Sequence, residues 1–79
     1  MIPQDLQGMT TQAISAYITK RHGIELRQHA PALAAMRDTE RIQRFEGVAL
    51  FLAAIVRWTG KEAQAIRGEL NRRLRSGDV

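Results

Sequence analysis

Residue types able to do chemistry are sparse in this sequence, and the histidines have the most suggestive spacing. His22, Glu25 and His29 stand three and four residues apart, which would align them on one face of a continuous helix as candidate metal ligands. Gly23 interrupts a helix through this stretch, so we favour structural or solvent-exposed roles for these side chains. The sequence therefore predicts no metal site and no cofactor.

The sequence offers equally little support for catalysis. It contains no cysteine, no His-Glu-x-x-His pattern and no phosphate-binding glycine loop, and its carboxylates are mostly interleaved with arginines. Because an active site needs convergent titratable groups, we predict that the protein is not an enzyme. The missing cysteines also argue against a disulfide-stapled secreted protein, and no apolar run is long enough to span a bilayer. We expect a cytoplasmic protein with no membrane partner.

The charge of the chain is mildly basic and comes largely from arginine. The 79 residues include 12 Lys and Arg against 8 Asp and Glu, and ten of the 12 cations are arginines. Guanidinium groups bind phosphates and carboxylates bidentately, although a genome rich in arginine codons would give the same excess without functional meaning. The surplus is greatest over residues 61–79, which hold five cations and three anions.

The apolar periodicity predicts an all-α protein, with residues 1–79 forming a single domain of about four helices. A first helix is expected over 10–22 with Thr10 as its cap, and a short helix over 30–36 with Pro31 in its first turn. Residues 1–9 and 76–79 are expected to be a loosely ordered lead-in and tail.

A long apolar helix over about residues 39–58 is the expected centre of the molecule. It would carry two adjacent apolar stripes, each with residues three or four apart. The first stripe consists of Ile42, Phe45, Ala49, Leu52 and Val56, and the second of Val48, Phe51, Ile55 and Trp58. About twenty residues would make a rod of roughly 30 Å, which must be covered on most sides. Because so short a chain buries a small core, we expect a second copy to contribute to this cover, in a homo-oligomer.

A basic amphipathic helix is expected over about residues 60–76. Thr59-Gly60-Lys61-Glu62 matches a capping box, in which Thr59 and Glu62 would each accept the other's backbone N–H. The inward stripe of this helix would leave Lys61, Arg72 and Arg75 pointing away from the core, with Arg67 and Arg73 on the flanks.

These features favour a small regulatory protein that binds nucleic acid, most simply DNA, as a homodimer. An apolar helix, a turn and a basic helix follow one another in the order of a helix-turn-helix, although Lys61 stands where that motif prefers an apolar residue. The phosphate contacts would come from cations of the last helix, and Gln64 could reach base edges. The predicted nucleic-acid-binding residues are Lys61, Gln64, Arg67, Arg72, Arg73 and Arg75.

The same residues allow a second interpretation, in which the last two helices form an antiparallel hairpin. The arginines would then only provide a charged, solvent-exposed surface for it. The protein would then be a non-enzymatic interaction module, an adaptor or inhibitor that docks on a larger protein. Aromatic residues are common at such interfaces, and Phe45, Phe51 and Trp58 would form the partner-binding patch.

Overall fold

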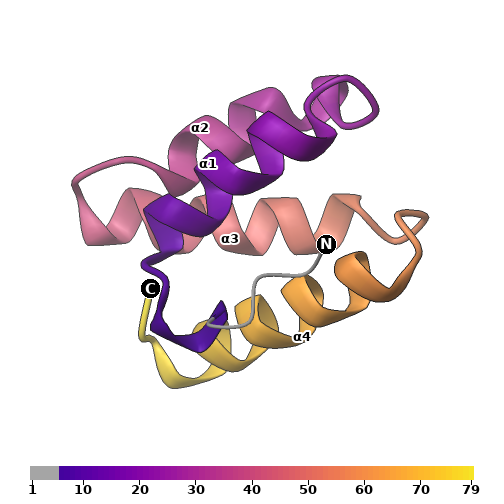
Figure 1. Ribbon diagram of the computed structural model, residues 1–79. Coiled ribbons are helices and arrows are strands. Elements are labelled where there is room, and N and C mark those ends of the chain that lie inside the picture. Colours follow the sequence, from indigo (N-terminus) through magenta and orange to yellow (C-terminus); the bar gives the residue numbers. More distant parts are fainter. Residues whose placement is uncertain (1–5) are drawn as a thin grey trace.

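The computed structural model describes residues 6–79, and all regular structure in this range is helical. Successive α-helices run in opposite directions (Figure 1). The elements are η1 (Leu6–Gly8), α1 (Thr11–His22), η2 (Arg27–His29), α2 (Ala30–Met36), α3 (Arg41–Ala54) and α4 (Lys61–Ser76), where η denotes a 3-10 helix. The predicted all-α fold with four helices is confirmed. No helix in the described range has both the length and the apolar character needed to cross a bilayer.

Local signals explain where the first helices begin. The Thr10 side chain accepts a hydrogen bond from the Ala13 backbone N–H at 3.0 Å, as expected of an N-cap residue. Pro31 lies in the first turn of α2, where its missing N–H costs no helical hydrogen bond. Of the predicted lead-in over 1–9, residues 6–8 form a 3-10 turn, and residues 1–5 lie outside the described range.

The prediction of a long central helix over residues 39–58 is wrong. α3 has 14 residues and ends at Ala54, after which the chain turns through residues 55–60 before α4 begins. Beyond the end of α3, Trp58 packs inward, and its ring meets His22 edge-on at 5.1 Å and Phe51 at 6.2 Å. The Trp58 backbone N–H also closes a turn onto the Ile55 carbonyl at 3.0 Å.

The two apolar stripes of this segment have opposite environments. The second stripe faces the core, with Val48, Phe51 and Ile55 all buried. The first stripe lies on the outside, where Ile42 is 69% exposed and Phe45 is 39% exposed. α3 is therefore covered on one side within the protomer, rather than on most sides.

Gly47 is what allows α2 and α3 to pack closely. A Cβ atom at this position would lie 2.7 Å from the backbone nitrogen of Met36 and 2.9 Å from the carbonyl carbon of Ala35. Because those neighbours are backbone atoms, they cannot move aside as a side chain would. The absence of a side chain at Gly47 thus sets the distance between the two helices.

The predicted capping box at the start of α4 is also wrong. Gly60, with φ of 114°, occupies the N-cap position, and no side chain caps the helix there. Glu62 instead turns towards α1, where it accepts hydrogen bonds from Tyr17 and His22. Glu62 thus pairs with side chains of α1, and not with the backbone of Thr59 as the capping box predicts.

The C-terminal tail, expected to be loosely ordered, is held by α3. The side chain of Arg41 donates to the Gly77 carbonyl, and Arg44 Nε donates to the main-chain oxygen of Val79 at 3.0 Å. Gly77 is left-handed with φ of 75°, and the Asp78 N–H bonds the Arg73 carbonyl at 3.0 Å, the pattern of a Schellman helix end.

Candidate nucleic-acid interface

The outer face of α4 is polar and basic. Helical geometry places six of its seven exposed residues within an arc of about 100°, with Ser76 at the helix end just outside it. We define the α4 outer face as Lys61, Gln64, Gly68, Asn71, Arg72 and Arg75, all of which are exposed. The two carboxylates of this helix lie elsewhere, Glu62 half-buried and Glu69 buried. Four of the six predicted nucleic-acid-binding residues thus lie together on one face of α4 that includes no carboxylate, while exposed Asp78, just beyond the helix, is near enough to add to the effect of Glu69 in raising the pKa of Arg72.

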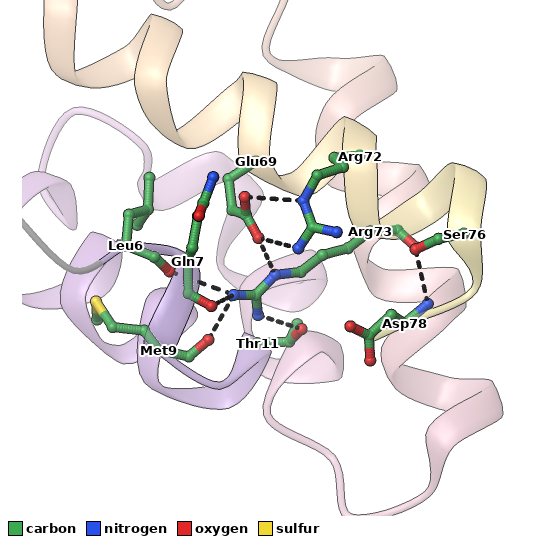
Figure 2. A network of polar contacts seen from close by, with 9 residues as sticks. All are labelled: Leu6, Gln7, Met9, Thr11, Glu69, Arg72, Arg73, Ser76 and Asp78. Carbon is green, nitrogen blue, oxygen red and sulfur yellow. Dashed lines mark hydrogen bonds and ion pairs between the residues drawn. The ribbon is translucent and has the colours of Figure 1, made fainter.

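Arg72 is the most constrained cation of this face. Its Nε and Nη2 donate to the two oxygens of Glu69 at 3.1 and 2.7 Å, while 48% of its side chain remains exposed (Figure 2). The hydrogen bonds from Arg72, followed by those from Arg73, hold the pKa of the Glu69 carboxyl below its ordinary value despite burial. One carboxylate is shared between two guanidinium groups, so the trio keeps a net positive charge.

Arg73, one of the predicted nucleic-acid-binding residues, does not lie on the α4 outer face. It is 5% exposed, and its Nε donates to Glu69 at 2.6 Å. The remaining guanidinium nitrogens point into the turn before α1, as Figure 2 shows. They donate to the Thr11 hydroxyl at 3.2 Å and to the carbonyls of Leu6, Gln7 and Met9 at 3.3, 3.3 and 2.5 Å. A side chain committed in this way cannot reach a phosphate.

Arg67 also turns inward and performs a structural role. Its Nη2 donates to the Ile55 carbonyl at 3.0 Å and to the Trp58 carbonyl, just beyond the end of α3. A cation at the C-terminal end of a helix satisfies carbonyls that have no intrahelical partner and complements the helix dipole. Arg67 therefore fixes the turn between α3 and α4.

A cluster of four polar side chains, which sequence reasoning missed, holds the N-terminal end of α4. Tyr17 donates from its hydroxyl to Glu62 Oε2 at 2.6 Å. The Nε2 atom of His22 pairs with Glu62 Oε1, and its Nδ1 pairs with Glu25 Oε1. A histidine can donate from both ring nitrogens only as the imidazolium cation, so this geometry favours the protonated ring. We call Tyr17, His22, Glu25 and Glu62 the His22 cluster.

The pKa directions within the His22 cluster agree with its geometry. Burial alone would lower the pKa of His22, but the hydrogen bonds to Glu62 and Glu25 outweigh it, and the net pKa is raised. Burial alone would raise the pKa of Glu62, but the hydrogen bonds from Tyr17 and His22 lower it overall. Burial and the bond to Glu62 both raise the pKa of the Tyr17 hydroxyl. Of the signals for this cluster, only the three-residue spacing of His22 and Glu25 was visible in the sequence.

The sequence-based metal hypothesis required His29 beside His22, and the structure separates them. His29 lies in η2, with its ring edge-on to Phe51 at 6.5 Å. Within residues 6–79 no three His, Cys, Asp or Glu side chains gather in a way that could hold a metal ion.

The three residues of the alternative partner-binding patch do not form an exposed surface. Phe51 and Trp58 are buried, which leaves Phe45 as the one partly exposed member of the predicted trio. Two exposed apolar side chains of α3, Ile42 and Phe45, lie instead on the first stripe, and a third, Leu50, is exposed outside both stripes.

Comparison of the chain with known family models, curated proteins and solved structures found no match.

Proposed function

We propose that the protein is a non-enzymatic nucleic-acid-binding protein that contacts duplex DNA, as a homodimer, through the outer face of α4. The observation that carries the proposal is the convergence of Lys61, Arg72 and Arg75 on one exposed face of α4 that includes no carboxylate. Such a face attracts phosphate groups and releases their counterions on binding.

The other residues of the face suit a polyanion rather than a protein partner. Gln64 and Asn71 carry amides that can donate to phosphate oxygens or to base edges. A Cβ at Gly68 would meet no other atom within 4 Å, so the centre of the face is open and the ligand could approach the helix backbone there. The face holds no large apolar side chain.

The proposed contact differs from that of a helix-turn-helix. Six residues separate α3 from α4, and the two helices run antiparallel in Figure 1, whereas that motif uses a turn of about three or four residues and a steep crossing angle. The arrangement is the hairpin considered above as the alternative. We therefore propose binding along the side of α4, mainly to the phosphate backbone.

Fluorescence anisotropy with a labelled DNA duplex, titrated at several salt concentrations, tests the proposal. Replacement of both Lys61 and Arg75 by Gln should weaken binding roughly tenfold at low salt, and each lost phosphate contact should reduce the slope of log K against log salt by about 0.9. The matched control replaces Lys20 and Arg27, two cations exposed on α1 and η2, by Gln. No binding at low salt, or an equal loss in the control, would overturn the proposal.

A further inference from the structure

The outer surface of α3 presents a row of apolar side chains that the protomer covers only in part, since Leu52 packs against the edge of the core. Ile42, Phe45, Ala49 and Leu52 follow one another at intervals of three, four and three residues, and so form a single stripe along the helix. Ile42 and Phe45 are exposed, and Ala49 and Leu52 are half-buried. We call these four residues the α3 outer stripe. Exposed apolar side chains that line up in this way mark an interaction surface more often than scattered ones do.

The order of side chains in this stripe fits a parallel pair of helices. In heptad notation Ile42 and Ala49 occupy a positions, and Phe45 and Leu52 occupy d positions. A β-branched residue at a together with Leu at d favours two-stranded parallel packing, and this stripe matches that pattern at Ile42 and at Leu52. The small side chain of Ala49 lets the two backbones approach in the middle of the helix.

The charges beside the stripe are complementary to those of a second copy in the parallel orientation. Arg41 and Glu46 are both exposed and occupy the flanking g and e positions. Within one helix they are about 140° apart and cannot pair, but in a parallel dimer each g residue faces the partner's following e residue. Two-fold symmetry would form the Arg41–Glu46 pair twice.

An antiparallel dimer with the same stripe would have unfavourable electrostatics. Overlap of the full helix then brings the two copies of Glu46, near the middle of α3, towards each other across the symmetry axis. Like charges at close range oppose that arrangement. The charge pattern therefore selects the parallel orientation.

We propose that the α3 outer stripe docks against the same stripe of a second copy in a parallel, two-fold symmetric dimer, with Arg41 of each copy paired to Glu46 of the other. Arg41 also donates from one nitrogen to Gly77, and its guanidinium carries enough N–H groups to serve both partners. A helix of 14 residues offers a seam of about 21 Å, so the dimer is expected to be weak and reversible. This inference supplies the dimer on which the proposed function rests, and its test involves no DNA.

Sedimentation equilibrium of the full chain over micromolar to millimolar concentrations tests the dimer. Ile42→Glu should abolish dimerisation, because it places a charge in the seam. The matched control is Leu50→Glu on the same helix, where Leu50 is 62% exposed but lies about 120° from the centre of the stripe. The Leu50→Glu variant should still form the dimer. Circular dichroism confirms that each variant remains folded.

A charge exchange tests the orientation. Arg41→Glu and Glu46→Arg should each weaken dimerisation roughly tenfold, since each puts like charges together at two symmetric places, and the double variant should restore the original affinity. A monomeric wild-type chain at millimolar concentration, a Leu50→Glu variant as defective as Ile42→Glu, or a double variant no better than the single ones would overturn the proposal. DNA binding by a strictly monomeric protein would reject the dimer and leave the α4 interface standing.

Discussion

The two ends of α4 are fastened to the rest of the protein by different chemistry. At its N-terminal end, Glu62 bonds to His22, and the hydrogen bonds of His22 to both Glu62 and Glu25 require a proton on each ring nitrogen. At its C-terminal end, Arg73 binds Glu69 and the carbonyls of the turn before α1. Arginine keeps its charge at every pH at which proteins fold, whereas histidine changes charge near neutrality. One attachment of α4 therefore responds to pH in the neutral range, and the other does not.

The largest effect is expected from Arg73→Met, which keeps much of the side-chain volume and removes the guanidinium. It leaves the buried carboxylate of Glu69 without its buried partner and frees three main-chain carbonyls, so the free energy of unfolding should fall by about 3–5 kcal/mol. Urea denaturation measures this change. Arg75→Met, on the exposed face of the same helix, is the control and should leave stability unchanged; a similar loss in both variants would refute the role assigned to Arg73.

An intermediate effect is expected from His22→Gln, and it should depend on pH. The pKa of His22 is raised above its ordinary 6.5, so its contribution is complete below about pH 6.5 and is lost as the pH rises through the folded-state value. The pKa values of Glu62 and Glu69 are lowered from 4.5, so their contributions are present above about pH 4.5 and are lost as the pH falls through their folded-state values.

The wild-type protein should therefore be most stable between about pH 4.5 and 6.5 and lose stability above this window. His22→Gln should remove about 1 kcal/mol within the window and flatten the decline above it. Thermal unfolding followed by circular dichroism at half-unit pH steps makes the comparison. A variant that keeps the wild-type decline would show that another group causes it.

The smallest effect is expected from Tyr17→Phe, which deletes the hydroxyl that donates to Glu62. The loss should be about 0.5 kcal/mol, close to the net value of one partly exposed hydrogen bond. Because His22 keeps both carboxylate partners, the decline in stability above pH 6.5 should persist. Thermal unfolding in parallel with His22→Gln separates the two contributions, and a flat pH profile in Tyr17→Phe would contradict the assignment of the decline to His22.

Features set by neighbouring residues could be predicted from the sequence. Thr10 caps α1 through an amide three residues away, and Pro31 lies in the first turn of α2, so both helices begin close to their predicted starts. α4 spans residues 61–76 against a predicted 60–76, because the inward stripe around Ile66 and Leu70 is unambiguous. The same periodicity placed Lys61, Arg72 and Arg75 outside.

Features set by distant partners could not be predicted. Both stripes of α3 are apolar, and the stripe that is buried is the one on the side where α2 packs closely against Gly47, a contact between distant parts of the chain. Glu62 had a local partner in the sequence, but His22, 40 residues away, binds it instead. Arg73 resembles its neighbours on the basic helix, and nothing near it in the sequence reveals that it reaches Leu6, 67 residues earlier.

The contact between Arg73 and the turn at residues 6–9 has a consequence for biosynthesis. A ribosome releases the chain from the N-terminus, so the segment around η1 emerges early, at a time when its eventual binding site has not been translated. Three of its carbonyls must stay hydrated until Arg73 leaves the exit tunnel. The contact therefore cannot form until α4 has been synthesised, after α1 to α3.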